Sequence, residues 1–277
     1  MCNNNDKKKE VGKKMTQFCS FNLRDFVEKK ANYHTHTTRC KHAEGEEREY
    51  VEKAIEAGYE ILGFSDHAPY VWGYDYVSPI RMEMHELEGY VRTIEKLKDE
   101  YKKDITIYTG LEIEYFPEQF ENTIEEIKKY PMDYMILGQH YLTTEIKERY
   151  AGRRRDDEST IQTYLEHIQK GLETGYFLYV AHPDLIHYTG DEKIRDKYFW
   201  QLAELLKKYD MPIEVNVNGY RAMIQYPNPR LVEIGVEVGN DFIVGVDAHR
   251  PNELLDYKNF DGCVELVKSR GGKVINL

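Results

Sequence analysis

Hydrophobic and polar positions alternate along this chain in a repeating order from residue 31 onwards. Short runs that are apolar or rich in β-branched residues are separated by longer segments that are rich in charge. Such a series is typical of strands that alternate with helices. The seven runs predicted to be strands are 31–36, 61–67, 105–115, 134–142, 177–185, 212–220 and 242–249.

The intervening segments carry the period of amphipathic helices. In the segment 84–101, Leu87, Val91, Ile94 and Leu97 fall on one helical face, which is the spacing of a helix packed on a sheet. Repeated strand–helix–strand units predict an α/β fold with a parallel sheet. The sequence lacks a G-x-G-x-x-G turn, which argues against a dinucleotide-binding sheet. A closed, barrel-like sheet is therefore favoured, with a doubly wound open sheet as the alternative.

Length and composition set the domain organisation. The chain has 277 residues, enough for one α/β barrel of about 250 residues. No Gly/Ser-rich or Pro-rich linker divides the series of elements, so residues 23–277 are predicted to form one domain. Residues 1–22 begin with charged and polar residues, without the apolar core of a signal peptide, and are predicted to be a disordered or loosely packed tail.

Charge and cysteine content exclude several classes of protein. The net charge of −11 opposes binding to the phosphate backbone of nucleic acids, so nucleic acid is not an expected partner. The sequence has no apolar run long enough to span a membrane. The four cysteines are scattered and include no CxxC pair, which indicates free thiols in a reducing, cytoplasmic compartment. The oligomeric state is left open.

Residues that can bind metals lie at or just after the ends of the predicted strands. The carboxyl ends of parallel strands in a barrel share one rim, where active sites form, so these side chains are expected to converge. In an H-x-H sequence both imidazoles lie on the same side of a strand. Imidazole and carboxylate together suit zinc, iron or manganese. The residues concerned are His34, His36, His42, Asp66, His67, Glu112, His140, His182, Asp184, Asn216, Asn218, Asp247 and His249.

Taken singly, each of these residues has a simpler interpretation. Asp66 could cap the next helix, and Glu112 could be a surface residue paired with a lysine. Seven of the ten histidines fall at predicted strand ends, and this joint pattern favours a metal site. His85 and His167 lie in charged helical segments and are expected to be solvated.

Seven motifs resemble the polymerase-and-histidinol-phosphatase (PHP) superfamily, in particular its monofunctional histidinol-phosphatase branch. The resemblance covers residues 31–277 and implies a distorted (β/α)7 barrel with three divalent metal ions at the C-terminal rim of the strands. The motifs are HTHTTRCKH, GFSDH, GLEIEY, ILGQHY, VAHPDLI, EVNVNGYR and GVDAHRP, in that order.

The resemblance also implies a distribution of nine ligands over the three metals. The first metal would be bound by His34, His36, Glu112 and Asp247. Glu112 would bridge to a second metal, bound also by His140 and His182. The third metal would be bound by His42, His67 and His249.

The implied activity is that of a phosphomonoesterase. Metal-bound water becomes hydroxide near neutral pH and would attack the phosphorus atom, while the metals neutralise charge on the phosphoryl oxygens. Glu112 and Asp247 are the predicted catalytic residues, and Asp247 is a hypothetical proton carrier for the leaving alkoxide. Asp66 and Asp184 are expected to orient ligand imidazoles.

An arginine fork is expected to bind the phosphate. Arg221 matches a phosphate-contacting position of the family, and Arg81 and Arg250 are weaker candidates. His187 stands in HPDLIHY, where the phosphatase branch commonly has an arginine. Histidine binds phosphate with more dependence on pH, so this departure bears on the substrate.

L-Histidinol phosphate is the favoured substrate. The alternatives are a phosphoesterase of other specificity, acting on a sugar or nucleotide phosphate or as an exonuclease, and a metal-binding regulator without catalysis.

Overall fold

The computed structural model describes residues 19–146 and 150–276. The prediction for the N-terminal tail falls mainly on residues 1–18, which lie outside the described part. Residues 19–22 are described, and here the ring of Phe21 stacks on that of Tyr108 with 4.1 Å between centroids. The chain next forms the short helix η1 (Leu23–Phe26), whose N-terminal amide is capped by the side chain of Asn22.

Two parallel sheets form the framework that carries the candidate site. The four-stranded sheet has the order β1-β2-β3-β4, and the three-stranded sheet has the order β5-β6-β7. The strands are β1 (Ala31–Asn32), β2 (Ile61–His67), β3 (Thr106–Ile113), β4 (Tyr134–Leu137), β5 (Ile213–Asn216), β6 (Asp241–Gly245) and β7 (Lys273–Ile275).

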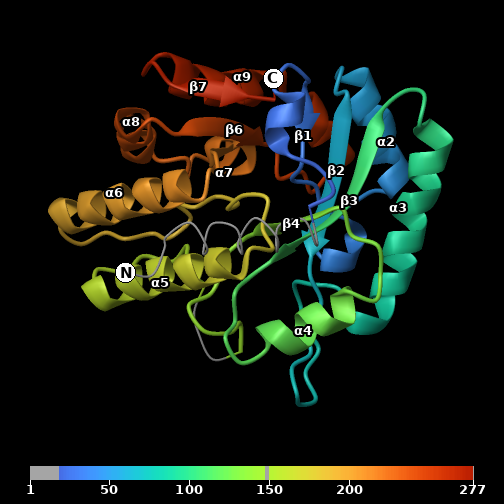
Figure 1. Ribbon diagram of the computed structural model, residues 1–277, viewed down its shortest axis with the longest axis horizontal. Coiled ribbons are helices and arrows are strands. Elements are labelled where there is room, and N and C mark those ends of the chain that lie inside the picture. Colours follow the sequence, from blue (N-terminus) through green and yellow to red (C-terminus); the bar gives the residue numbers. More distant parts are fainter. Residues whose placement is uncertain (1–18, 147–149, 277) are drawn as a thin grey trace, which may run out of the picture.

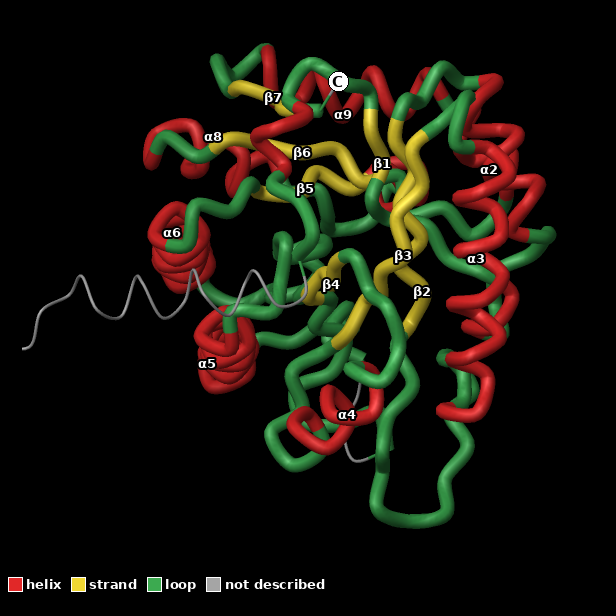
Figure 2. The backbone as a smooth tube through the Cα atoms, turned by 45° about the vertical axis from the view of Figure 1, so that its right-hand side comes forward, coloured by secondary structure: helices red, strands yellow, loops and turns green. Residues whose placement is uncertain are grey.

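Single bridges join the two sheets into one curled arrangement. Val180 pairs in parallel with Leu137 at the end of β4 and with Ile213 at the start of β5. On the other side, Thr35 pairs in parallel with Ala248, which follows β6. Figure 2 shows the strands curving around a common interior with the helices outside them. The α/β class and the parallel strand direction are thus as the sequence predicts.

The prediction of a strand over 177–185 is wrong. In this stretch Val180 makes single bridges only, because the backbone turns away at His182, which has a φ of 28°, and Pro183 follows without an amide hydrogen. The predicted strand 212–220 ends early at Asn216, whose side chain caps a short helix. The strand β7 near the C-terminus was not predicted.

Helices cover the outside of the sheets (Figure 1). The segment predicted as an amphipathic helix forms α3, preceded by a short 3-10 turn. The α-helices are α2 (Glu47–Glu56), α3 (Leu87–Tyr101), α4 (Phe120–Ile127), α5 (Glu158–Thr174), α6 (Glu192–Lys208), α7 (Val217–Ala222), α8 (Pro229–Val238) and α9 (Tyr257–Lys268). The other 3-10 helices are η2 (Thr38–Cys40), η3 (Met84–Glu86) and η4 (Pro251–Leu255).

A buried tyrosine fills the interior of the curled sheet. Gly63 and Gly110 leave this space open, since a Cβ atom on either would lie within 2.4 Å of a Tyr134 side-chain atom. The Tyr134 hydroxyl donates to the carbonyl of Tyr33 at 2.7 Å and lies 3.1 Å from that of Phe64. The phenol therefore ties β1 and β2 together below the ends that carry the histidines.

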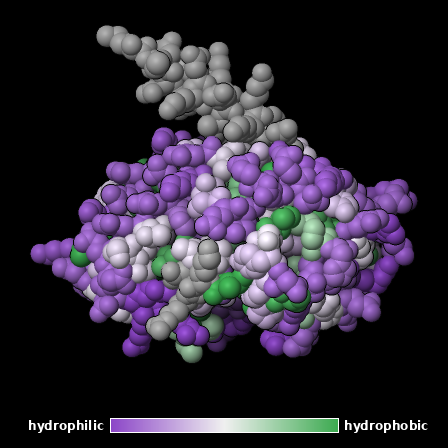
Figure 3. Space-filling view, turned by 90° about the horizontal axis from the view of Figure 1, so that it is seen from below, coloured by the Kyte–Doolittle hydropathy of each residue, from purple (hydrophilic) through white to green (hydrophobic). Residues whose placement is uncertain are grey.

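The outer surface is polar on the face shown in Figure 3, where hydrophobic residues form small separate patches. Within the described residues, no helix is both long and apolar enough to cross a membrane.

Candidate metal centre

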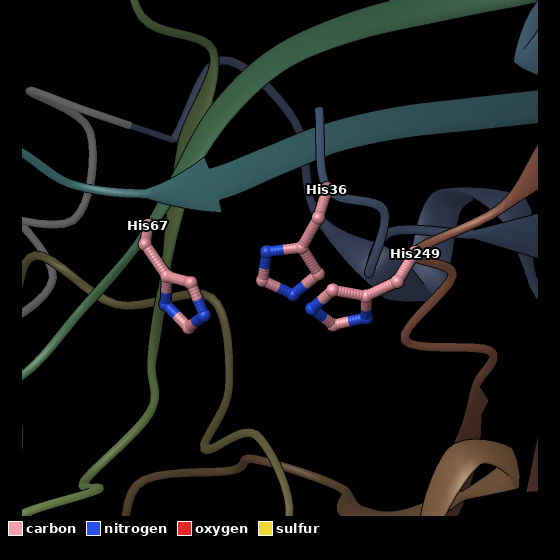
Figure 4. Close-up of side chains that lie close together, drawn as sticks. All are labelled: His36, His67 and His249. Carbon is pink, nitrogen blue, oxygen red and sulfur yellow. The ribbon is translucent and has the colours of Figure 1, made fainter. Parts of the chain in front are cut away.

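Histidines from three distant segments meet at the carboxyl ends of the strands. Figure 4 shows the rings of His36, His67 and His249 turned toward one another. The ring of His36 lies 4.1 Å from that of His249 and 4.5 Å from that of His67, measured between centroids. His36 follows β1, His67 ends β2, and His249 follows β6. The predicted convergence of strand ends is thus observed.

Glu112, near the end of β3, lies at the middle of the group. Its Oε1 atom is 3.0 Å from His182 Nε2 and 3.6 Å from His140 Nε2. Its Oε2 atom is 3.1 Å from His67 Nδ1. A Cβ atom on Gly138 would lie 1.9 Å from Glu112 Oε1, so the carboxylate occupies its position because residue 138 has no side chain.

Asp247, two residues after the end of β6, contacts two histidines of the group. Its Oδ1 atom lies 3.1 Å from His36 Nε2 and 3.5 Å from His34 Nε2. Its Oδ2 atom lies 3.3 Å from the amide nitrogen of Asn216 and 3.2 Å from that of Asn218. The two asparagines thereby fix one oxygen and leave the other directed at the histidines.

The ninth predicted ligand, His42, lies at the outer edge of the group. Its Nε2 atom is 3.1 Å from Nε2 of His249, and its side chain is exposed. All nine predicted ligand positions therefore come together. Eight of them line a cavity of about 440 Å³, and His34 is buried behind it.

The orientation of four imidazoles directs their ligand atoms inward. The Nδ1 atom of each faces an oxygen that can only accept a hydrogen bond, so Nδ1 carries the proton and Nε2 keeps the lone pair. The Nδ1 contacts are His34 with Glu214 at 2.8 Å, His140 with Glu114 at 3.0 Å, His42 with the carbonyl of Cys40 at 2.7 Å, and His249 with the carbonyl of Asp247 at 3.1 Å.

The inward-facing atoms fit metal ions. Nε2 of His34, Nε2 of His36 and both carboxylate oxygens of Glu112 are buried and make no hydrogen bond among the described residues. Buried polar atoms normally have partners, and a divalent cation bound by imidazole and carboxylate would supply one here. Several three-residue groups in this region have ligand atoms within 4.8 Å of one another.

The electrostatics of the group also favour cations. Burial lowers the pKa of His36, but the nearby carboxylates of Asp247 and Asp66 outweigh burial and raise it to about 9. Burial and the charge of His36 lower the pKa of His67 to about 3. Burial raises the pKa of Glu112, yet the surrounding histidines hold it well below its ordinary value. The carboxylates thus stay ionised, and bound metals would replace the protons that balance them.

Of the residues behind the ligands, the carboxylates Glu114 and Glu214 were not predicted, whereas Asn216 and Asn218 were predicted at a strand end. Glu214 contacts His34, Glu114 contacts His140, and Asn216 and Asn218 contact Asp247. Glu114 lies two residues after Glu112, a spacing that could have identified it. The tyrosines Tyr141, Tyr150 and Tyr226, which also line the cavity, were not predicted either.

The predicted orienting residues differ in their contacts. Asp66 lies 3.4 Å from His36 Nδ1 without a hydrogen bond to it and accepts from Thr37, so its orienting role stays a prediction. Asp184 accepts instead from the backbone amide of Asn228, and burial raises its pKa to about 7. The structure therefore gives Asp184 no direct contact with a ligand imidazole among the described residues.

The predicted substrate-binding residues lie in different places. Arg221 and Arg250 line the cavity, whereas His187 and Arg81 are not among its lining residues. Arg81 is fully buried in ion pairs, so the structure does not bring it to the cavity. Among the other histidines, His85 is exposed as predicted, whereas the prediction of a solvated His167 is wrong because it is 8% exposed.

The sequence of this chain matches the model of a known protein family. The model of the PHP domain matches residues 32–218. The chain belongs to the PHP domain family. A probable histidinol-phosphatase of Deinococcus radiodurans is 28% identical over 250 residues, covering 87% of this chain and 94% of the relative. A histidinol-phosphatase of Bacillus subtilis is 35% identical over 124 residues, covering 42% of this chain and 46% of the relative.

Two solved structures share this fold. The histidinol phosphate phosphatase of Lactococcus lactis, crystallised with zinc, L-histidinol and phosphate, has a TM-score of 0.69 and 20% sequence identity. The match covers 89% of this chain and 95% of that one. A putative histidinol phosphatase of Listeria monocytogenes has a TM-score of 0.68 and 22% identity, with 81% and 97% of the two chains covered.

Proposed function

We propose that this PHP protein is a metal-dependent phosphomonoesterase that converts L-histidinol phosphate to L-histidinol and phosphate. The proposal depends mainly on the group of ligand atoms at and behind the cavity wall, which face inward around Glu112. Nε2 of His34, Nε2 of His36 and both carboxylate oxygens of Glu112 are buried and make no hydrogen bonds among the described residues. Relatives named as histidinol-phosphatases support the choice of substrate. The closed form of the curled sheet, a distorted (β/α)7 barrel, belongs to the same proposal.

The chain offers ligands for three divalent cations of zinc, iron or manganese type. When bound, these ions supply an activated water and neutralise charge on the phosphoryl oxygens. Glu112 would contact the first and second ions, because its Oε2 atom lies 3.6 Å from His36 Nε2 and its Oε1 atom lies 3.0 Å from His182 Nε2. The proposed sets are His34, His36, Glu112 and Asp247; then Glu112, His140 and His182; then His42, His67 and His249.

Arg221 is the proposed phosphate-binding residue. Its guanidinium lies at the cavity, 2.9 Å from Glu253 Oε1 and 2.8 Å from Asn218 Oδ1. These contacts hold the fork in place before substrate arrives, so little side-chain freedom is lost on binding. Arg250 also lines the cavity but is exposed and paired with Glu44, which suits a weaker contact. Replacement of Arg221 by lysine should raise KM for the ester more than it lowers kcat.

Asp247 is proposed as a metal ligand that also handles the proton of the leaving alkoxide. The position of Oδ1 beside His34 and His36 supports the ligand role. An Asp247→Asn variant tests the second role. Unchanged turnover together with unchanged metal content would remove Asp247 from both.

The proposed function is tested by kinetics with defined metals. The metal-free protein is reloaded with manganese, zinc or iron and assayed on histidinol phosphate and on a panel of small phosphate esters. We expect the highest kcat/KM for histidinol phosphate, and hydrolysis of p-nitrophenyl phosphate but not of its bis ester. Preference for another ester would overturn the substrate, and cleavage of single-stranded DNA would indicate a nuclease. Metal uptake without any turnover would indicate a non-catalytic metal-binding protein.

The cytoplasm is the proposed location. Cys19, Cys40 and Cys263 are free thiols in the described residues, which is typical of reducing compartments.

A further inference from the structure

A fully buried arginine lies behind the metal ligands. Arg81 comes from the loop that leads from β2 to η3, and its side chain is 0% exposed. Its two terminal nitrogens lie 2.9 and 3.0 Å from the two oxygens of Glu114, which is a bidentate fork. Its Nε atom and one terminal nitrogen lie 2.8 and 2.6 Å from Glu145 Oε2. One guanidinium thus joins three separate segments of the chain.

Glu114 also contacts His140, one of the predicted metal ligands. The same Oε1 atom that accepts from Arg81 lies 3.0 Å from Nδ1 of His140. The other ring nitrogen, His140 Nε2, faces Glu112 Oε1 at 3.6 Å. The hydroxyl of Tyr70 donates to the Glu114 carbonyl at 2.6 Å, so the backbone of Glu114 is held as well as its side chain.

Stability alone does not account for this arrangement. A buried ion pair loses hydration energy, and apolar residues of similar size are often as stabilising or more so. The property that a fork adds is orientation, because its two parallel hydrogen bonds fix the plane of the carboxylate. A carboxylate fixed in this way fixes in turn the tautomer and rotation of the imidazole that it contacts.

We propose that Arg81 and Glu114 are positioning residues for His140. The Arg81 fork fixes Glu114, Glu114 holds His140 with Nε2 toward Glu112, and the pair thereby sets the affinity for the metal that His140, Glu112 and His182 would bind. This inference rests on the proposed function, since it assumes that these residues bind a metal.

The test measures metal binding in the full-length protein, without relying on turnover. Wild type, Glu114→Gln and Arg81→Lys are loaded with cobalt, and the affinity of each class of site is measured by competition with a chelator. Asp196→Asn is the matched control, because it also breaks a carboxylate–arginine pair, with Arg230 at 2.9 Å, among residues that do not line the cavity. The visible spectrum of cobalt reports the ligand geometry, and thermal unfolding reports stability.

We expect Glu114→Gln to weaken one class of site by about 10- to 100-fold, the range typical of residues that orient metal ligands. Arg81→Lys should weaken the same class by a smaller factor, because lysine keeps the charge but loses the fork. The cobalt spectrum should change in both variants and remain that of wild type in Asp196→Asn.

Three outcomes would overturn the inference. Wild-type affinities in both variants would show that the pair does not position His140. Equal weakening of every class of site, in parallel with lost thermal stability, would show a general structural role. If Glu114→Gln does not fold, Arg81→Lys decides between these outcomes alone. A wild-type protein that takes up no metal would refute the proposed function and the inference with it, which separates that failure from the first two.

Discussion

Two carboxylates stand behind the candidate metal centre on opposite sides, and their surroundings differ. Glu114, on the side of the four-stranded sheet, contacts His140 and is paired with Arg81. Glu214, in β5 of the three-stranded sheet, contacts His34 at 2.8 Å and also accepts from the backbone amide of His182. Its partners among the described residues include Asn216 but neither a lysine nor an arginine.

A carboxylate behind a ligand histidine can therefore support two strengths of metal binding, depending on its neighbours. A carboxylate behind an imidazole raises its basicity as a ligand. Glu214 acts on His34 without a lysine or arginine beside it, whereas the positive charge of Arg81, which is shared between Glu114 and Glu145, partly offsets that of Glu114 at His140. We therefore expect the metal on the His34 side to bind more tightly than the metal on the His140 side.

The largest effect is expected from displacing Glu112, the carboxylate that both sides of the centre share. Gly138→Ala places a Cβ atom 1.9 Å from Glu112 Oε1 and displaces the carboxylate shared by both sides. Loss of metal stabilisation worth several kcal/mol lowers kcat/KM on the order of 10³-fold. Steady-state kinetics and metal content measure this loss.

Gly89→Ala in α3 is the control for that substitution, because its Cβ atom would meet nothing within 4 Å. It should keep wild-type activity and raise stability slightly. Equal activity of the two variants would remove Glu112 from the centre of the site.

The second effect is the dependence of stability on pH, which should differ between the metal-free and the metal-loaded protein. In the metal-free protein the pKa of His36 is raised to about 9, so the stability it contributes is complete below its unfolded pKa of about 6.5 and is lost as the pH rises through 9. The pKa values of His67 and His249 are lowered to about 3. Their neutral forms are favoured by folding, so stability is also lost as the pH falls from about 6.5 toward 3.

Denaturant unfolding after removal of metal should therefore show greatest stability near pH 6.5, with about 3 kcal/mol lost on the alkaline side. The metal-loaded protein should not show the alkaline loss, since bound metal takes the place of the protons. A metal-free protein whose stability rises steadily from pH 6.5 to 9 would contradict these electrostatics.

Glu214→Gln tests whether the metal sites beside Glu214 and Glu114 differ in affinity. Loss of the charge behind His34 should weaken the tighter class of metal site by about 10- to 100-fold, a different class from the one affected by Glu114→Gln. Gly245→Ala should have a similar effect, because its Cβ atom would lie 1.9 Å from Glu214 Oε1. Chelator competition distinguishes the two classes. If Glu214→Gln and Glu114→Gln weaken the same class, the two sides are not independent.

The smallest effect is expected at His187. Its backbone amide donates to the carbonyl of Ala151 at 3.1 Å, and its side chain is not among those that line the cavity. His187→Arg should change KM for histidinol phosphate by less than about threefold, roughly 0.7 kcal/mol. A larger fall in KM would show that residue 187 reaches the phosphate.

The convergence of the candidate metal ligands could be predicted from sequence because their positions depend on local rules. Alternation along strands places His34 and His36 together, and parallel strands end at one edge, which brings in residues such as Glu112 and Asp247. The supporting residues depend on tertiary distance. Arg81 and Glu114 are 33 residues apart, and an arginine in a loop is ordinarily exposed, so nothing local indicates that this one is buried.

The errors in predicted elements have a similar origin. The run 177–185 is apolar enough for a strand, but the left-handed backbone at His182 limits its pairing to Val180. His167 lies on a charged helix, yet its ring is 6.3 Å from that of Tyr115, measured between centroids. The first error comes from the backbone turn at His182 and the second from burial of His167 by another segment, and no periodicity in the sequence records either.

Tyr134 in the interior of the sheet has a consequence for how this chain can evolve. Its ring occupies the space that Gly63 and Gly110 leave open, and its hydroxyl binds two carbonyl groups. A side chain gained at either glycine would collide with the ring, while a smaller residue at 134 would leave a void and remove the hydrogen bond to the Tyr33 carbonyl. Residues 63, 110 and 134 are therefore expected to constrain one another during evolution, with a large side chain at 134 requiring glycine at the other two positions.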